Sequence, residues 1–546
     1  MARSAHVDHF TRDNLPPASQ LPEFLFDPPV PKYPQRMNAA VELVDLHVRA
    51  GRGDAIALRT EDASCTYRQL QQRVNQIAHV LRAEMGLVPG NRVLLRGPNN
   101  PMMAACWLAI VKAGLVAVAT MPLLRARELV PVMEKARVNA ALCDVRLREE
   151  FEVARTQAHC PELGPALWFN HGDGTTPAPG SLDALCLRQP EGFEACDTAA
   201  DDVAMIAFTS GTTGKPKGTM HFHRDIIASS DLFPKSVMHV APDDVYCGTP
   251  PLAFTFGLGG LLCFPLRAGA STLLIERLTP QGLLAAIERN RVTACFTAPT
   301  FYRQMAALAR DYDLSSLRQC VSAGEGLPDA TRQLWREATG IEITDGIGST
   351  EMFNMFISSS GAEVRHGAIG KAVPGYVARV VDESMHPLPP GTIGRLAVKG
   401  PTGCKYLADD RQRSYVEDGW NLTGDLFEMD RDGYFIYHAR SDDMIISAGY
   451  NIAGPEVESV LLLHEAVAEC GVVGEPDEAR GQVVKAFIVL REGMLERFGG
   501  EVALVKLLQD YVKTASAPYK YPRRIEFREA LPRTETGKLQ RFKLRA

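Results

Sequence analysis

Short apolar segments alternate with amphipathic helical patterns along most of this chain, and this alternation limits the folds open to it. One helix is expected to begin at Thr66, a good capping residue, because apolar residues from Leu70 to Leu81 recur at helical spacing. Apolar segments short enough for buried strands lie at 92–95, 116–119, 140–143, 203–209, 271–275, 294–297 and 317–322. Strands separated by amphipathic helices predict an α/β fold with largely parallel sheets.

The pattern changes after residue 376. Shorter alternating strands with Gly and Pro turns follow, for example at 387–394 and 430–433, and they predict a small antiparallel β unit. A polar segment at 439–443 then precedes a last block with α+β character. One hydrophobic core rarely grows beyond about 250–300 residues. Because the chain has 546 residues, we expect separate lobes with a cleft between them.

Composition limits the class of function. The chain carries 59 Lys and Arg against 65 Asp and Glu, a net charge of −6, which argues against nucleic acid or an anionic membrane as the main partner. Twelve cysteines without a CxxC spacing predict reduced thiols in the cytoplasm. Residues 1–20 lack the apolar segment of a signal peptide. The apolar stretch 102–124 is interrupted by Lys112, Gly114 and Pro122, so we expect a buried helix and strand there rather than a membrane span.

The most informative motif is Thr-Ser-Gly-Thr-Thr-Gly-Lys-Pro-Lys-Gly at 209–218, directly after a predicted buried strand. Its glycines allow several backbone N–H groups to converge, as a phosphate requires, and its lysines supply positive charge. The spacing differs from a Walker A loop, because only two residues separate the first two glycines and Pro216 follows the first lysine. The residues expected to contact phosphate are Thr209, Ser210, Gly211, Thr212, Thr213, Gly214 and Lys215.

This segment resembles the phosphate loop of the adenylate-forming superfamily, which comprises acyl-CoA synthetases, carrier-loading adenylation domains and luciferases. Further family motifs follow in order, at 345–351 (Asp-Gly-Ile-Gly-Ser-Thr-Glu), 420–425 (Trp-Asn-Leu-Thr-Gly-Asp), 440–443 (Arg-Ser-Asp-Asp) and 532–538 (Pro-Arg-Thr-Glu-Thr-Gly-Lys). The resemblance runs from about residue 66 to the last residue. It implies an enzyme that uses ATP and Mg²⁺ to activate a carboxylic acid as its adenylate.

The resemblance also implies roles for individual residues. Thr350 would contact a nucleotide phosphate and Glu351 would hold Mg²⁺, an ion that binds few carboxylates and shares its shell with water and phosphate oxygens. Asp425 would accept hydrogen bonds from both ribose hydroxyls, supported by Arg440. Lys538 would bridge the acid and the α-phosphate as a mobile positive charge. Further nucleotide contacts are expected from Gly324, Glu325, Gly326, Asp345, Gly346 and Ile347.

A second half-reaction follows from the mobile last block. The resemblance implies rotation about Asp442, which divides the chain into an N-terminal ATP- and acid-binding domain (1–440) and a small, mobile α+β C-terminal lid (441–546). Gly449 would then leave room for the pantetheine arm of coenzyme A, or would merely form a turn. We expect coenzyme A as the acceptor, and a separate carrier protein is the alternative. A homodimer is compatible with these features.

The acid is indicated by departures from common family patterns. Phe254 occupies a position where many relatives have His, and Ile347 stands where relatives often have Tyr. Together with 257–259 (Gly-Leu-Gly), 99–103 (Asn-Asn-Pro-Met-Met) and 119–124 (Ala-Thr-Met-Pro-Leu-Leu), they resemble benzoate and especially 2-aminobenzoate CoA ligases. A flat apolar slot for an aryl ring would be lined by Phe254, Phe256, Ala323, Gly324 and Gly348. Asn354 would accept a hydrogen bond from an ortho-amino group of the ring or donate one to a hydroxyl.

Plainer interpretations stand beside these predictions. The Phe pair is also compatible with core packing, and Asn354 with a structural amide. His221 and His223 indicate structural roles rather than a metal pair, because no third ligand lies nearby in the sequence. The alternative functions are activation of another acid, loading of a carrier protein, or nucleotide binding without chemistry.

Overall fold

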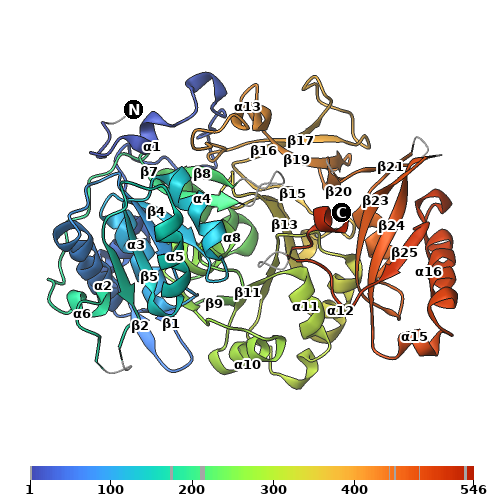
Figure 1. Ribbon diagram of the computed structural model, residues 1–546, viewed down its shortest axis with the longest axis horizontal. Helices are drawn as coiled ribbons and strands as arrows, with labels where there is room; N and C mark the ends of the chain where they lie inside the picture. Colours follow the sequence, from blue (N-terminus) through green and yellow to red (C-terminus); the bar gives the residue numbers. More distant parts are fainter. Residues whose placement is uncertain are drawn as a thin grey trace.

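A computed structural model describes residues 3–172, 176–209, 216–441, 443–447, 450–478, 480–533 and 538–545. It confirms the predicted α/β class. Figure 1 shows two sheets of the large N-terminal part, an antiparallel β unit at the top, and a smaller C-terminal unit at the right.

The first sheet has six strands in the order β6-β5-β3-β4-β7-β8. Neighbouring strands are parallel except for β8, which runs antiparallel to β7. The strands are β3 (Arg92–Arg96), β4 (Val116–Thr120), β5 (Ala140–Asp144), β6 (Ala166–Phe169), β7 (Val203–Thr209) and β8 (Lys217–Phe222). The predicted strand at 203–209 is therefore confirmed at both ends, and 210–216 joins two adjacent antiparallel strands.

The second sheet has nine strands in the order β15-β14-β13-β12-β11-β9-β10-β1-β2. It is parallel from β1 to β13, with antiparallel strands at both edges. Its strands are β1 (Ile56–Arg59), β2 (Ser64–Thr66), β9 (Val245–Gly248), β10 (Ser271–Leu273), β11 (Ala294–Thr297), β12 (Gln319–Ser322), β13 (Ile343–Gly348), β14 (Met355–Ser358) and β15 (Lys371–Ala372).

Helices cover these sheets and follow the predicted patterns. Helix α2 (Tyr67–His79) begins after Thr66, whose side chain accepts a hydrogen bond from Gln69 N while the Gln69 side chain accepts one from Thr66 N. The apolar stretch 102–124 forms α3 (Pro101–Lys112) and β4, and Lys112 is buried against Asp45 at 2.7 Å. The other principal helices here are α4 (Ala126–Ala136), α5 (Arg148–Gln157), α7 (His223–Phe233), α10 (Pro280–Asn290), α11 (Pro299–Ala306) and α12 (Asp329–Thr339).

The antiparallel unit and the C-terminal unit complete the fold. The antiparallel unit contains β16 (Val377–Val381), β17 (Gly394–Lys399), β18 (Val416–Glu417), β19 (Trp420–Met429) and β20 (Phe435–Arg440). The C-terminal unit contains β21 (Ile445–Ser447), β22 (Tyr450–Ile452), β23 (Val467–Asp477), β24 (Gly481–Leu490) and β25 (Arg524–Phe527) with helices α14 (Gly454–Leu461) and α16 (Glu501–Ala515). A separate buried cluster that includes Ile445, Val472 and Leu508 supports the expectation of a distinct C-terminal core.

Candidate functional site

Several predicted residues meet where neighbouring strands end. Strands β12 and β13 run parallel, with Ser322 opposite Asp345. Residues 323–326 directly follow β12, while Asp345, Gly346, Ile347 and Gly348 form the end of β13. Ligands of α/β sheets bind beyond the carboxyl ends of the strands. The two predicted segments therefore lie together at the edge where such a site is expected.

The predicted phosphate loop follows β7, which ends at Thr209, and precedes β8, which begins at Lys217. Thr209 is the last residue of β7 and pairs with Lys217, the first residue of β8. Ser210, Gly211, Thr212, Thr213, Gly214 and Lys215 lie outside the described residues. The two strands thus define where the loop begins and returns.

Thr350 and Glu351 follow β13 and are held by side chains from β8 and from 403–407. The Glu351 side chain is buried, and Tyr406 donates a hydrogen bond from its hydroxyl to Glu351 Oε1. The Nζ of Lys217 lies 3.3 Å from the same hydroxyl and donates to it. His221 Nε2 donates to the Thr350 carbonyl at 2.8 Å. Glu351 therefore has one carboxylate oxygen fixed by a buried partner.

His221 is a neutral donor in this arrangement. It is fully buried, and burial, with a smaller contribution from Lys405, lowers its pKa to about 3. Because a carbonyl only accepts, the Nε2 atom carries the proton. His223 has a different partner, since its Nδ1 accepts a hydrogen bond from Ala39 N at 3.1 Å. The two histidines thus hold separate parts of the backbone.

Asp425 and Arg440 face each other across β19 and β20. Arg440 Nη1 donates to Asp425 Oδ1 at 3.1 Å and to the Thr423 carbonyl at 2.9 Å. Burial raises the pKa of Asp425, and the Arg440 guanidinium acts against that rise. The predicted ribose pair is therefore an assembled ion pair on paired strands.

Lys538 brings the C-terminal unit to this site. A Cβ added to Gly324, whose φ is +99°, would lie 3.3 Å from Lys538 Cε. Lys538 is an exposed residue, but desolvation of its ammonium group is the largest influence on its pKa and lowers it. Glu325, Asp425 and Glu351 act to raise that pKa, and Arg440 to lower it. The electrostatic environment of Lys538 thus includes predicted residues from three separate motifs.

Glu325 is also linked to the last segment of the chain. Arg533 Nη1 lies 3.4 Å from Glu325 Oε2, while Thr300 Oγ1 donates to Glu325 Oε1 at 2.6 Å. In Figure 1 the C-terminus accordingly lies back against the large domain near β20. Asp442, the predicted hinge, and Gly449, predicted to leave room for the pantetheine arm, lie outside the described residues.

The predicted acid pocket contains half-buried aromatic rings. Phe254 directly precedes the short helix α8 (Thr255–Leu258), and the Phe256 ring lies 5.7 Å from the Phe296 ring. Both phenylalanines pack against the main hydrophobic core. The core packing expected as the plainer interpretation is therefore present, and the lining of an aryl slot stays a prediction.

Asn354 is anchored by its own neighbours. It is buried, donates from Nδ2 to the Thr255 carbonyl at 3.1 Å, and accepts at Oδ1 from Met355 N at 2.9 Å. A Cβ on Gly348 would lie 2.5 Å from the Asn354 carbonyl oxygen, so only glycine fits there. Asn354 therefore has the structural role that the plainer interpretation expects. Its Oδ1 keeps a second lone pair for a further donor, and its Nδ2 keeps one N–H for a further acceptor.

The nucleotide side of β13 combines burial with close packing. Burial raises the pKa of Asp345 to about 6, and Arg332 acts against that rise. A Cβ on Gly346 would lie 2.6 Å from Met355 Sδ. Ile347 is half-buried and packs against the core, so this position presents an aliphatic side chain.

The residues fit a magnesium ion held mainly by substrate. Within the described part of the chain, no group of three or more His, Cys, Asp and Glu side chains is placed to bind a metal. Glu351 offers a buried carboxylate, the hard oxygen ligand that Mg²⁺ prefers, and phosphates and water usually complete such a shell. One protein carboxylate at this position therefore suffices.

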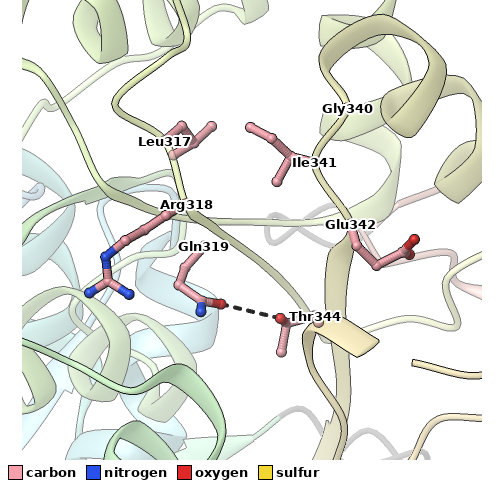
Figure 2. Close-up of a pocket in the computed structure, with 8 residues that line it drawn as sticks. Leu317, Arg318, Gln319, Gly340, Ile341, Glu342 and Thr344 are labelled. Atoms are coloured by element: carbon pink, nitrogen blue, oxygen red, sulfur yellow. Dashed lines mark hydrogen bonds between the residues drawn. The ribbon is translucent and has the colours of Figure 1, made fainter. Parts of the chain in front are cut away.

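A separate pocket lies at the amino ends of strands in the second sheet, opposite the carboxyl ends described above. Figure 2 shows this pocket of about 290 Å³ at the amino ends of β12 and β13, where Thr344 Oγ1 donates to Gln319 Oε1 at 3.4 Å. It is lined by Leu317, Arg318, Gln319, Gly340, Ile341, Glu342, Thr344 and Gly361. The chemical groups described above lie at the other ends of the same strands.

Sequence reasoning missed the supports behind the site. Tyr406, and the buried ion pair of Lys405 with Asp225 at 2.8 Å, gave no motif-level signal. His221 was singled out, but its hydrogen bond to Thr350 spans 129 positions of the chain.

None of the helices in the described ranges is long and apolar enough to cross a bilayer. All twelve cysteines are free thiols.

Comparison with known proteins gives the class. The model for "AMP-binding enzyme" matches residues 46–406, and that for "AMP-binding enzyme C-terminal domain" matches 456–538. The benzoate–CoA ligase of Thauera aromatica is 36% identical over 531 residues, covering 95% of this chain and 98% of that protein. The chain belongs to the AMP-binding enzyme family, which the motif resemblance had predicted.

Solved structures narrow the class. The anthranilate CoA ligase AuaEII, solved in complex with anthranoyl-AMP, has a TM-score of 0.88 and 34% identity, covering 94% of this chain and 97% of that one. A benzoate CoA ligase from Burkholderia xenovorans LB400 has a TM-score of 0.83 and 31% identity, with coverage of 93% and 100%. The protein is an acid–thiol ligase that uses ATP, Mg²⁺ and coenzyme A. The activity these relatives support is ligation of an aryl acid to coenzyme A.

Proposed function

We propose that the aryl acid is 2-aminobenzoate, with benzoate as the closest competitor. The carrying observation is the hydrogen bond from the buried Asn354 amide to the carbonyl of Thr255, the residue between the half-buried Phe254 and Phe256. Aromatic side chains suit a flat ring, and the second lone pair of Asn354 Oδ1 can accept a hydrogen bond from an ortho-amino group. Similarity to the AuaEII structure, which holds anthranoyl-AMP, supports the same acid.

We further propose how the residues divide the first half-reaction. A carboxylate oxygen of the acid attacks the α-phosphorus of ATP as the bond to pyrophosphate breaks. Both reactants are anionic, so the site must align them and neutralise charge. Lys538 is suited to contact both, and Thr350 and the 209–215 loop would hold phosphate oxygens. Mg²⁺, bound by Glu351 and phosphate, would supply further neutralisation. Asp425 with Arg440 would fix the ribose.

The second half-reaction requires Lys538 to leave. The thiolate of coenzyme A attacks the acyl carbon and AMP departs with its phosphate oxygen. We propose that residues 441–546 rotate about Asp442 between the two steps, and that Gly449 then admits the pantetheine arm. The C-terminal unit has its own buried core, and the Arg533–Glu325 ion pair contacts the large domain at 3.4 Å. A unit with its own core can move as a body, which supports this rotation.

Pyrophosphate release over a panel of acids tests this function. The panel contains 2-aminobenzoate, benzoate, 2-hydroxybenzoate, phenylacetate and hexanoate, each with and without coenzyme A. We expect the highest kcat/KM with 2-aminobenzoate, and thioester formation only with coenzyme A. A higher kcat/KM with hexanoate would contradict the aryl pocket.

The Asn354→Ala variant tests the ortho contact. Because the amide also bonds to Thr255, absolute rates will fall with every acid, so the informative quantity is the ratio of kcat/KM for 2-aminobenzoate to that for benzoate. We expect this ratio to fall by about three- to tenfold, the effect of one hydrogen bond. An unchanged ratio assigns Asn354 to structure alone.

A further inference from the structure

A buried tyrosine contacts the carboxylate assigned above to Mg²⁺. Tyr406 is 1% exposed and donates its hydroxyl hydrogen to Glu351 Oε1. In the described part of the chain, Oε2 of Glu351 receives no hydrogen bond. One oxygen of this carboxylate is therefore fixed, and the other is free for a cation.

The hydroxyl of Tyr406 is the donor in this contact. An ionised carboxylate oxygen only accepts hydrogen bonds, so the hydroxyl hydrogen of Tyr406 points to Glu351. The hydroxyl also receives a hydrogen bond from Lys217 Nζ at 3.3 Å. The order of donation therefore runs from Lys217 through Tyr406 to Glu351.

The position of Tyr406 is fixed by its backbone and its ring. Residues on both sides are bonded to β8, since Met220 N donates to the Lys405 carbonyl and Leu407 N donates to the Gly218 carbonyl, each at 2.8 Å. The ring packs edge-on against the buried Tyr415 ring with centroids 5.7 Å apart. The hydroxyl thus approaches Glu351 from a segment that is bonded to β8, the strand that follows the predicted phosphate loop.

We propose that Tyr406 is a positioning residue for magnesium, holding Oε1 of Glu351 so that Oε2 faces the ion bound with ATP. The inference rests on the metal role proposed for Glu351. A carboxylate on a flexible side chain would otherwise lose rotational freedom when the ion binds. The hydrogen bond from Tyr406 restricts the Glu351 side chain before the ion binds. Lys217 in turn bonds to the Tyr406 hydroxyl and lies at the start of β8, the strand after the predicted phosphate loop.

The expected effect follows from similar supports at other metal sites. Groups that hydrogen-bond to metal ligands typically contribute about 10–100-fold to metal affinity. Tyr406→Phe removes the hydroxyl and keeps the ring, so the packing against Tyr415 is retained. We expect weaker metal binding by about 10–100-fold, with little change in binding of the metal-free nucleotide.

The test measures metal binding rather than turnover. Mn²⁺, which also prefers oxygen ligands, is titrated into enzyme holding a non-hydrolysable α,β-methylene analogue of ATP, and free Mn²⁺ is followed by electron paramagnetic resonance. The enzyme is in excess over the analogue, so the nucleotide is protein-bound. Calorimetry gives the Kd of the analogue without metal. The matched control is Tyr67→Phe, which removes another buried hydroxyl, bonded to the Ala270 carbonyl at 2.8 Å in the core of the large domain.

Each outcome decides between the two assignments. The proposal expects a 10–100-fold higher Kd for Mn²⁺ in Tyr406→Phe, a change below twofold in Tyr67→Phe, and a large increase in Glu351→Gln. If Glu351→Gln weakens Mn²⁺ binding and Tyr406→Phe does not, the role of Tyr406 is overturned and that of Glu351 stands. If Glu351→Gln leaves Mn²⁺ binding unchanged, the metal assignment itself is wrong. A weaker Mn²⁺ affinity in Tyr67→Phe equal to that in Tyr406→Phe would reduce the effect to general destabilisation and overturn the proposal.

Discussion

Replacement of Lys538 by methionine tests the division of labour between the two half-reactions. Methionine keeps an unbranched side chain against Gly324 and removes the ammonium from among Glu325, Asp425 and Glu351. One fixed electrostatic contact to a developing charge is typically worth about 10²–10³ in rate, or about 2.7–4 kcal/mol. We therefore expect adenylation by Lys538→Met to slow by about that factor.

The two half-reactions are assayed separately. Pyrophosphate release from ATP and 2-aminobenzoate in a single turnover reports adenylation, and thioester formation from supplied acyl-adenylate and coenzyme A reports the second step. We expect the second rate to stay within about threefold of wild type, because in the proposed mechanism Lys538 has left the site before this step. The control is Lys506→Met, which removes an exposed lysine on α16 of the same unit. Equal losses in both steps would refute the role assigned to Lys538.

The pH dependence of adenylation gives a second test of the same residue. Desolvation lowers the pKa of Lys538 below its ordinary value of 10.5. Only the protonated form carries the charge, so activity is full at lower pH and falls as pH rises through the lowered pKa. The fall should appear in kcat/KM, which reports the free enzyme. In Lys538→Arg the guanidinium stays charged, so a surviving fall at the same pH would contradict the assignment.

Other substitutions separate the remaining roles. Gly449→Leu should spare pyrophosphate release and block thioester formation. An equal loss of pyrophosphate release would show that Gly449 does not serve to admit the pantetheine arm. Asp425→Asn should raise the KM for ATP by about tenfold or more through the loss of charge-assisted hydrogen bonds to ribose, whereas an unchanged KM would remove the residue from the nucleotide site. Asp345 has a folded-state pKa of about 6 against 3.8, so folding favours its protonated form and stability falls as pH rises between these values, by about 3 kcal/mol at neutral pH. Asp345→Asn should accordingly raise the melting temperature more at pH 7.5 than at pH 4.5, and an equal change at both would refute the burial argument.

The sequence predicted what local patterns encode. The strand at 203–209, the cap at Thr66 and the α/β class are confirmed, because hydrophobic spacing and capping act between residues that are close in the chain. Motif order was enough to name Asp425 and Arg440, which the structure pairs across two strands. Tyr406 could not be named in this way. Its partner Glu351 is 55 positions away, and their contact depends on how 403–407 lies against β8.

The buried pair of Lys405 and Asp225 shows why such supports escape sequence reasoning. Both side chains are fully buried, and such a pair is weak evidence for stability because desolvation offsets the attraction. What the Lys405–Asp225 pair contributes here is a link between two segments of the chain. Asp225 also accepts from Phe222 N at 2.9 Å, while Lys405 donates to the Gly403 carbonyl at 2.8 Å, so the pair ties the end of β8 to 403–407.

That tie holds the supports of Thr350 and Glu351 on two neighbouring segments, β8 and 403–407. His221, on β8, donates to the Thr350 carbonyl, and Tyr406, beside Lys405, donates to Glu351. The Lys405 charge also helps to keep His221 neutral, since it acts with burial to lower the imidazole pKa. A protonated His221 would add a second buried cation next to Lys405 and weaken the Lys405–Asp225 pair. The ion pair, the histidine and the tyrosine thus together hold Thr350 and Glu351. These contacts join residues that are far apart in the chain, so only the folded structure shows that they act on the same two residues.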